Sequence, residues 1–360
     1  MERADVLIVG GGPAGSACAT ALAGAGRDVL VVDAAVFPRD KPCGGWVTPE
    51  VLEEIPFSLE SYAKDHVAQP ISRFRVGRID GRAVEVDYGT PVSYGIRRTE
   101  FDHHLLRRSG ARVVEGERAR KIELRDGSFV LNGTLAAPVL VGAGGHFCPV
   151  ARHLGEAAEA SSVVVAREIE FPLGEDDASR CQVEQERPEL YFCADLRGYG
   201  WCFRKGDYLN IGLGRLDSAR LPTHLRAFLE FLRRKKRVGR VPENGWRGHA
   251  YALWNGRSRR VAGDGIVLVG DAAGLAAATS GEGILPAIIS GRLAAEAILE
   301  SRISDYPKRL EERLGPRASS RRLPDRIASA LGAALLAIPG FARRLVLDRW
   351  FLHRSGQTGA

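Results

Sequence analysis

The residues best suited to chemistry form a G-x-G-x-x-G pattern that begins at Gly10, directly after a short β-branched strand. Gly10 permits a tight turn, Gly12 lets the backbone approach a pyrophosphate, and Gly15 allows the following helix to pack closely on the strand. The start of that helix, with Pro13 and Ala14, offers unpaired N–H groups and a partial positive charge to phosphate oxygens. The pattern therefore predicts a dinucleotide-binding site.

A carboxylate closes the next predicted strand, Arg27–Asp33. At that position Asp33 can accept hydrogen bonds from both hydroxyls of an adenosine ribose, whereas it would repel a 2′-phosphate. A glycine-rich turn without a ligand would leave Asp33 unexplained. NADP is thus disfavoured at this site, although this first motif does not separate FAD from NAD.

A second candidate segment lies far along the chain, after another buried strand. Asp271 follows Gly270 at the strand end, where a carboxylate can reach a hydroxyl of a flavin's ribityl chain. Gly281, Gly283 and Ile284 then start a helix whose N-terminal amides can face the N1–O2 edge of an isoalloxazine and stabilise the anionic reduced flavin. The alternative is an aspartate that caps an ordinary helix. Together the two segments indicate FAD, bound non-covalently.

Two further sets of side chains are candidates for a substrate site. Tyr199, Trp201 and Phe203 alternate along one predicted strand and share a face, which is either one wall of an apolar slot over the flavin or simply a packed sheet face. Cys43 lies in a glycine-flanked loop beside Lys41, and a nearby cation favours the thiolate form. Cys43 is either a proton donor or a small residue where only a small residue fits. Histidine and cysteine spacings predict no metal site.

The elements that must position these residues are of two kinds. Short, wholly apolar strands near residues 5–9, 27–33, 135–141 and 266–269 predict a parallel sheet with helices. Alternating segments between Ser161 and Trp254 predict a largely antiparallel sheet. The fold class is therefore α/β: a Rossmann-like, doubly wound FAD-binding domain of the glutathione-reductase type, an inserted antiparallel substrate domain and a C-terminal helical tail. The predicted boundaries are 1–70, 96–160 and 255–302 for the FAD-binding domain, 71–95 and 161–254 for the substrate-binding sheet, and 303–360 for the basic tail.

Composition and charge narrow the function classes. The chain has 360 residues, of which 45% are hydrophobic, so disorder and a multi-span membrane protein are excluded. Residues 301–360 carry the whole net charge of +7, and residues 1–300 contain equal numbers of basic and acidic residues. Residues 324–354 mix aromatic and aliphatic bulk with cations, which suits a peripheral membrane contact or a lid. The basic run Arg233–Arg237 is interpreted as a solvated helix end, so nucleic acid is not an expected partner.

The expected compartment is the cytoplasm, with the inner face of a membrane as a further site of action. The N-terminus leads straight into a strand without a signal-peptide layout. The six cysteines are scattered, which is typical of free thiols in a reducing compartment.

These residues resemble the geranylgeranyl reductase family, within the para-hydroxybenzoate-hydroxylase-like FAD proteins, from residue 4 to about residue 300. Phe37–Gly45 is similar to the family loop in which a cysteine and two glycines, here Cys43, Gly44 and Gly45, approach the flavin. Arg98-Thr-Glu-Phe-Asp102 is similar to the R-x-x-F-D helix start, whose arginine reaches the phosphate–ribityl side of the flavin.

The most specific match is the segment Tyr199–Gly214, which resembles the prenyl reductase signature P-x-x-Y-x-W-x-F-P-x(7–8)-G-x-G. Leu196 and Arg204 stand in place of its two prolines. Gly144 replaces the acid of a G-A-D-G motif found in related hydroxylases.

The resemblance implies an FAD-dependent oxidoreductase that reduces carbon–carbon double bonds in an apolar, prenyl or lipid-like substrate with a hydride from flavin N5. NAD(P)H binding transiently, or another electron donor such as a redox protein, would reduce the FAD, and Cys43 or water would supply the proton. Two alternatives stay open: a flavin monooxygenase that hydroxylates or epoxidises through a C4a-hydroperoxide, and a flavoprotein accessory acting on a partner polypeptide.

The predicted catalytic residues are Cys43, Tyr199 and Trp201. The predicted cofactor-binding residues are Gly10, Gly12, Pro13, Ala14, Gly15, Asp33, Lys41, Cys43, Gly44, Gly45, Arg98, Gly270, Asp271, Gly281, Gly283 and Ile284.

Overall fold

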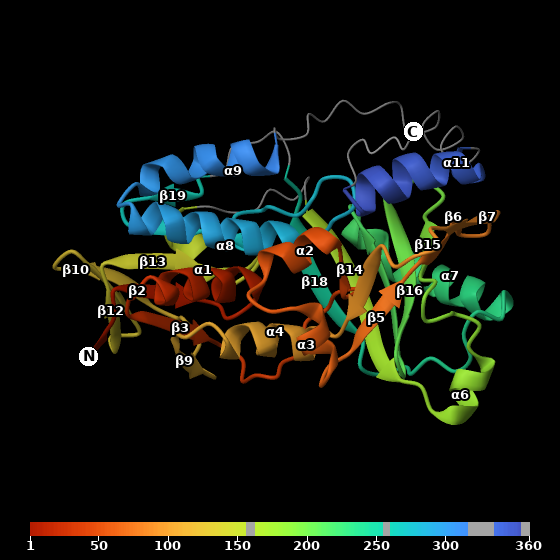
Figure 1. Ribbon diagram of the computed structural model, residues 1–360, viewed down its shortest axis with the longest axis horizontal. Coiled ribbons are helices and arrows are strands. Elements are labelled where there is room, and N and C mark those ends of the chain that lie inside the picture. The colour runs from red at the N-terminus through yellow and green to blue at the C-terminus, as the bar shows by residue number, and fades with distance from the viewer. Residues whose placement is uncertain (156–162, 255–259, 316–334, 354–360) are drawn as a thin grey trace.

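The computed structural model describes residues 1–155, 163–254, 260–315 and 335–353. Two sheets lie side by side, each with its own helices (Figure 1). One sheet is largely parallel and the other largely antiparallel, so the predicted α/β fold class with an inserted antiparallel sheet is confirmed.

The six-stranded sheet has the order β19-β20-β13-β2-β3-β9 and is parallel except at β19. All four residues of its central strand β2 are buried, as expected for apolar strands covered on both faces. The strands are β19 (Ala262–Gly263), β20 (Ile266–Leu268), β13 (Val139–Gly142), β2 (Val6–Val9), β3 (Val29–Asp33) and β9 (Arg112–Glu115).

Two helices rich in small residues, α1 (Pro13–Gly24) and α8 (Ile284–Leu299), pack closely on each other beside this sheet (Figure 1). The chain turns from β2 into α1 at Gly10, whose φ is +115° and where a Cβ would stand 2.3 Å from the Ala143 carbonyl oxygen. A Cβ at Gly15 would stand 1.9 Å from the Gly10 carbonyl oxygen. Both positions therefore require glycine, as the motif predicts.

Helix α4 (Arg98–Arg107) differs from its predicted start. The sequence predicts a helix capped by Thr99, but the cap is Arg97 and it makes no side-chain capping bond. Arg98 is already helical, and this places its guanidinium one turn before the Asp102 carboxylate that it binds. The predicted cap is therefore wrong.

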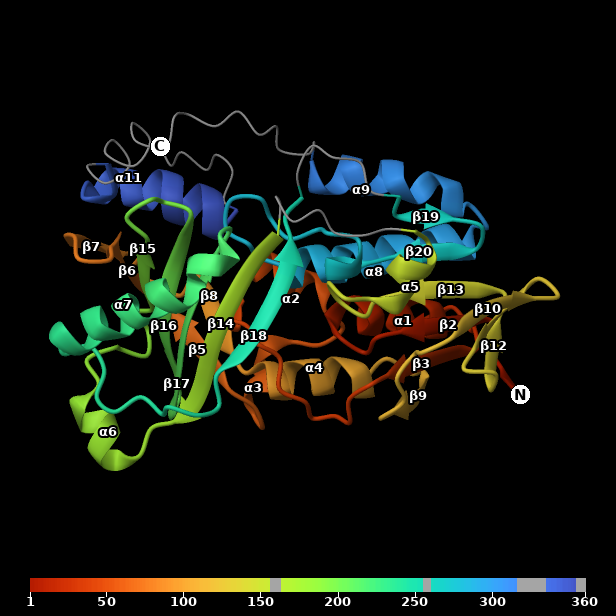
Figure 2. The ribbon, with the colours of Figure 1, turned by 180° about the vertical axis from the view of Figure 1, so that it is seen from behind.

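The seven-stranded sheet has the order β18-β14-β17-β16-β15-β6-β7 and is antiparallel except between β15 and β6. Helix α7 (Leu221–Arg234) covers one face, and the C-terminal helices α11 (Pro339–Phe341) and η5 (Ala342–Phe351) cover part of the other (Figure 2). The strands are β18 (Arg247–Ala252), β14 (Val163–Pro172), β17 (Tyr208–Arg215), β16 (Gly198–Lys205), β15 (Glu189–Phe192), β6 (Arg73–Arg78) and β7 (Ala83–Asp87).

Smaller elements complete the described chain. A four-stranded sheet contains β1 (Glu2–Arg3), β12 (Leu135–Ala137), β11 (Ser128–Leu131) and β10 (Ile122–Arg125), and a three-stranded sheet contains β4 (Trp46–Val47), β8 (Ser93–Ile96) and β5 (Ala68–Ile71). The remaining helices are α2 (Pro49–Glu54), α3 (Leu59–Ala63), α5 (Pro149–His153), α6 (Glu175–Arg180), η2 (Ser218–Arg220), η3 (Gly270–Ala272), η4 (Ile303–Asp305) and α9 (Tyr306–Leu314).

Of the segment 324–354, interpreted as a membrane contact or a lid, residues 324–334 and residue 354 lie outside the described residues. Within its described part, η5 buries Ala342, Val346, Leu347 and Phe351 against the seven-stranded sheet. Among the helices of the described ranges, none has the length and apolarity that a bilayer crossing requires.

Candidate active site

A cavity of about 520 Å³ runs between the two sheets, from Asp33 at one end to Phe351 at the other. All the predicted catalytic and cofactor-binding residues line it except Gly15, which packs behind the turn at Gly10. The structure thus brings together residues that are scattered from Gly10 to Ile284 in the sequence.

At the first end of the cavity, the Asp33 carboxylate is fixed by the backbone. Its Oδ2 accepts a hydrogen bond from the Gly11 N–H at 2.8 Å, and its Oδ1 accepts one from the Ala35 N–H at 2.8 Å. Each carboxylate oxygen keeps a further lone pair. Asp33 can therefore still accept hydrogen bonds from ribose hydroxyls.

The start of α1 fits the pyrophosphate of FAD. Gly12 caps the helix without a side-chain hydrogen bond, and the first turn holds no acidic residue. Arg39 lies alongside: a Cβ on Gly12 would stand 3.2 Å from its Nη2, and its buried Nη1 has no hydrogen-bond partner. An unpartnered guanidinium nitrogen beside free helix amides suits a phosphate oxygen. Sequence reasoning missed Arg39, although the Arg98 motif points to this side of the cofactor.

Arg98 connects the pyrophosphate region to the Cys43 loop. It is buried and binds Asp102 through two hydrogen bonds, from Nε at 2.7 Å and from Nη2 at 2.8 Å. The Arg98 guanidinium also interacts electrostatically with the Cys43 side chain, and the Cys43 sulfur accepts the Gly45 N–H at 3.4 Å. Cys43 thus lies beside two cations, the predicted Lys41 and also Arg98.

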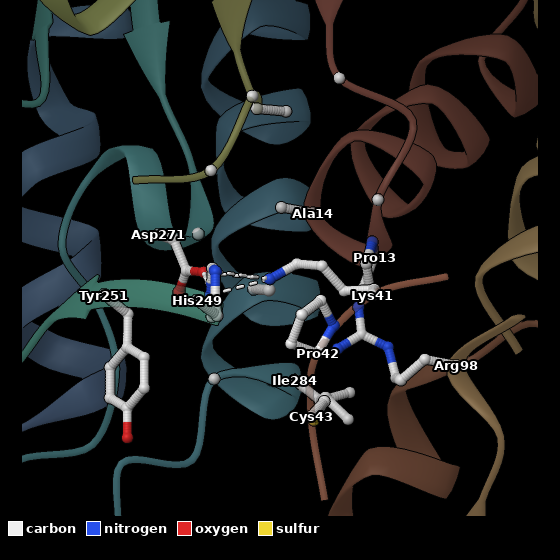
Figure 3. A pocket seen from close by; sticks show the side chains of 18 of the residues that line it. Pro13, Ala14, Lys41, Pro42, Cys43, Arg98, His249, Tyr251, Asp271 and Ile284 are labelled. Atoms are coloured by element: carbon white, nitrogen blue, oxygen red, sulfur yellow. Dashed lines mark hydrogen bonds and ion pairs between the residues drawn. The ribbon is translucent and has the colours of Figure 1, made fainter. Parts of the chain in front are cut away.

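Lys41, His249 and Asp271 form a polar chain in the middle of the cavity (Figure 3). The Lys41 Nζ lies 2.8 Å from the His249 Nε2, and that nitrogen lies 3.1 Å from the Asp271 Oδ2. Burial lowers the pKa of Lys41 to about 8 and also lowers the pKa of His249. Burial opposes ionisation of Asp271, but the hydrogen bond from His249 and the charge of Lys41 lower its pKa to about 2. Asp271 is therefore an ionised acceptor.

The loop before α8 closes the cavity next to Asp271. A Cβ on Gly283 would stand 3.4 Å from the Asp271 Oδ1, and α8 begins at Ile284 without a side-chain cap. The Tyr199 hydroxyl donates a hydrogen bond to the Ser280 carbonyl at 2.6 Å. Free helix amides and the carboxylate therefore lie together, as binding of a flavin ring and its ribityl chain would require.

The far end of the cavity has an aromatic wall. Tyr199, Trp201 and Phe203 line it from β16, and Phe351 from η5 joins them. The Phe351 ring stacks on Trp46 at 5.2 Å between centroids with an interplanar angle of 14°. This wall can bind an apolar substrate and exclude water.

Several residues of the cavity were not found from the sequence. His249, Glu168 and Tyr251 carry no motif, and only strand register places them on the face of Trp201. In the described part of the chain, no three His, Cys, Asp or Glu side chains converge in a way that could hold a metal ion.

Comparison with known proteins identifies the family. A family model described as FAD dependent oxidoreductase matches residues 5–208. A menaquinone reductase of Mycobacterium tuberculosis is 35% identical over 371 residues, which cover 94% of this chain and 86% of that protein. A chloroplastic geranylgeranyl diphosphate reductase of Oryza sativa subsp. japonica is 32% identical, covering 83% of this chain and 67% of that protein. The chain belongs to the geranylgeranyl reductase family of FAD-dependent oxidoreductases.

A solved structure of a geranylgeranyl bacteriochlorophyll reductase-like protein from Thermoplasma acidophilum shares the fold of this reductase-family chain, with a TM-score of 0.73. It is 23% identical and covers 94% of this chain and 88% of that one. The sequence-based resemblance, the enzyme class and the FAD cofactor are confirmed.

Proposed function

We propose that this FAD-dependent oxidoreductase reduces carbon–carbon double bonds in the prenyl chain of an apolar substrate. The observation that carries the proposal is the aromatic wall, which continues the same cavity as the cofactor-binding residues. The relatives support it, because menaquinone and geranylgeranyl diphosphate, the compounds named for them, share a prenyl chain. The saturation of such chains is our expected reaction.

The bound flavin supplies a hydride, and the chain's residues determine where it goes. The Gly12 turn and Arg39 would hold the pyrophosphate, Asp33 the ribose, and Asp271 the ribityl chain. Tyr199 fixes the loop before α8 through the Ser280 carbonyl, and Trp201 forms the wall against which a double bond can lie. The proposed electron donor is NAD(P)H or a redox protein.

The function is tested by reducing the FAD-loaded enzyme with dithionite and mixing it anaerobically with menaquinone or geranylgeranyl diphosphate. We expect the flavin absorbance to return and the prenyl chain of the product to gain two hydrogens per reduced double bond, a gain that must be located in that chain because the menaquinone ring can also take up two hydrogens. Reoxidation only after oxygen is admitted, with an oxygen atom in the product, would instead make the protein a monooxygenase. A flavin that neither compound reoxidises would contradict both prenyl substrates.

We also propose that the enzyme acts at the cytoplasmic face of a membrane, through the described part of residues 324–354. Ile338 is 50% exposed there, and Arg344 and Arg349 are exposed on the same C-terminal segment. Cations beside an exposed apolar residue suit an anionic lipid surface. The protein should float with anionic vesicles, and the double variant Arg344→Glu/Arg349→Glu should not. Equal flotation of both proteins would contradict this contact.

A further inference from the structure

We propose that Glu168 is the acid that protonates the prenyl double bond. This inference rests on the proposed reductase function and names a residue that the sequence motifs do not contain. The proposed proton donor is therefore a residue of β14, whereas the sequence analysis expected the donor to be Cys43 or water.

Glu168 is a buried carboxyl group on the wall of the cavity. Its side chain is on the same sheet face as Trp201, and it is 3% exposed. A Cβ at Gly212 would stand 2.2 Å from the Trp201 ring and 2.8 Å from the Glu168 Cβ. The missing side chain at Gly212 therefore lets the indole lie directly beside Glu168.

Asn210 joins Glu168 to the two parts of the site that a substrate must meet. Its Nδ2 donates to the Glu168 Oε2 at 2.6 Å and to the Cys43 carbonyl at 3.1 Å. Its Oδ1 accepts the Trp201 indole N–H at 2.7 Å. One amide thus fixes the carboxyl group relative to both the aromatic wall and the Cys43 loop.

A second glutamate on the same strand, whose Oε2 also lies 3.3 Å from the Asn210 Nδ2, has a different charge environment. Glu170 forms ion pairs with Lys205 and with Arg97, whose Nε lies 3.0 Å from its carboxylate. Burial opposes ionisation of Glu170, but these cations lower its pKa, and it lies outside the described cavity lining. Burial instead raises the pKa of Glu168 to about 7, against the opposing charge of Lys205. Carboxyl groups with such divergent environments are typical of acid catalysis.

The proposed step balances as a net addition of hydrogen. One alkene carbon takes a hydride that comes from the reduced flavin, while the π electrons of the double bond form a C–H bond with the proton of Glu168. The C=C π bond, the O–H bond of Glu168 and the bond that held the hydride on the flavin break, two C–H bonds form, and the flavin would lose two electrons. The Glu168 carboxylate then takes a proton from solvent.

The first experiment measures the reoxidation rate of the dithionite-reduced, FAD-loaded enzyme by geranylgeranyl diphosphate in the absence of oxygen, because the quinone ring of menaquinone could accept the electrons itself. Removing a general acid typically slows a reaction about 10²–10⁴-fold, so Glu168→Gln should be at least about 100-fold slower. Flavin affinity and the rate of reduction by dithionite should match the wild type. The wild-type rate should fall as pH rises through about 7, because the acid is then lost. This alkaline limb should be absent in Glu168→Gln.

Glu170→Gln is the matched control, since it changes the same residue type on the same sheet face. The charged groups around Glu168 are Glu170 on β14, Lys205 on β16, Arg247 opposite it on β18, and Asp40 in the loop. The negative charge of Glu170 raises the pKa of Glu168. Glu170→Gln should therefore keep the alkaline limb but move it to lower pH. Cys43→Ala should keep the limb in place.

Infrared spectroscopy of the oxidised wild-type holoenzyme gives a test that needs no variant to fold. A protonated buried carboxyl band should disappear as pH rises through about 7. Glu168→Gln should lack this band. Its absence from the wild type, or a Glu168→Gln variant with the wild-type rate and alkaline limb, would overturn the inference while prenyl reduction stands. If the wild type saturates neither menaquinone nor geranylgeranyl diphosphate, the proposed function fails and this inference falls with it.

Discussion

The two faces of the seven-stranded sheet are built by alternate residues of the same strands, yet only one of them borders the cavity. On one face, Ile169, Tyr191 and Ile211 pack beneath Phe228 of α7. On the other, Glu168, Asn210 and Trp201 take the intervening positions and border the cavity. The face toward α7 is therefore covered by that helix, whereas the other face is covered only in part by η5 and leaves Glu168, Asn210 and Trp201 beside the cavity.

The difference shows where a function is held in this fold. Burying a carboxyl group without a matching cation is unfavourable, and the buried Glu168 carboxyl group accepts its hydrogen bond from the neutral amide of Asn210. Buried polar groups of this kind are typical of functional sites.

The largest effect is expected on the face toward α7. Phe228 is fully buried, and its ring fills the space above Gly200, where a Cβ would stand 2.6 Å away. Phe228→Ala should lower the free energy of unfolding by about 3–5 kcal/mol, measured by urea denaturation. The folded variant should reoxidise with menaquinone at nearly the wild-type rate. A loss below about 1 kcal/mol would mean that this face is not a tight core.

A matched pair of variants compares one hydrogen bond on each face. Trp201→Phe removes the indole N–H from Asn210, and Tyr191→Phe removes the hydroxyl that donates to Glu189 at 2.8 Å. Each should cost about 1–2 kcal/mol in unfolding free energy. Only Trp201→Phe should slow reoxidation by geranylgeranyl diphosphate, by about tenfold, since Trp201 also positions Asn210 beside Glu168. Equal slowing in both variants would contradict the claim that only the face with Trp201 takes part in the reaction.

The C-terminal helix extends the face toward the cavity and should affect substrate binding. Phe351 lies on Trp46 at the end of the cavity away from Asp33. Phe351→Ala should raise the menaquinone concentration needed for half-maximal reoxidation by about tenfold, because an apolar contact is lost. FAD affinity, followed by flavin fluorescence, serves as the control. A normal menaquinone dependence would remove η5 from the substrate site.

The smallest effect is a pH-dependent contact at the end of η5. The hydrogen bond from His353 to Glu282 raises the pKa of His353. A raised pKa in the folded state means that the stabilisation is full below the ordinary value near 6.5 and is lost as pH rises through the folded value. Unfolding free energy should thus drop by up to about 1 kcal/mol between about pH 6 and about pH 9. Its control, His353→Gln, should lack this drop, and an unchanged drop would contradict the assignment.

The sequence motifs predicted those features of the site whose geometry is set by residues close together in the chain. The turn at Gly10, the Asp33 strand end and the Gly270-Asp271 turn depend on backbone geometry within a few residues, so their motifs placed them beside one cavity. The alternation of Glu168 with Ile169 could have assigned that glutamate to a sheet face. Its bond to Asn210, however, depends on the pairing of β14 with β17, a register that no short pattern encodes.

Two other outcomes had different physical causes. The cap at Thr99 was wrong because the helix begins two residues earlier, after Arg97, so that Arg98 lies in its first turn and pairs with Asp102 one turn later. The basic C-terminal segment was left between a lid and a membrane contact. Its described part packs Phe351 on Trp46, a contact between opposite ends of the chain that sequence patterns do not reveal.

The central claim is that a prenyl double bond meets the flavin at the Glu168–Trp201 face, and a crystal structure of the FAD-loaded enzyme with menaquinone would test it most directly. We expect the flavin ring beside Lys41 and Asp271, and the prenyl chain against Trp201 with a double bond within reach of the Glu168 carboxyl group. A chain bound away from this face, with Glu168 separated from it by ordered protein, would contradict the account.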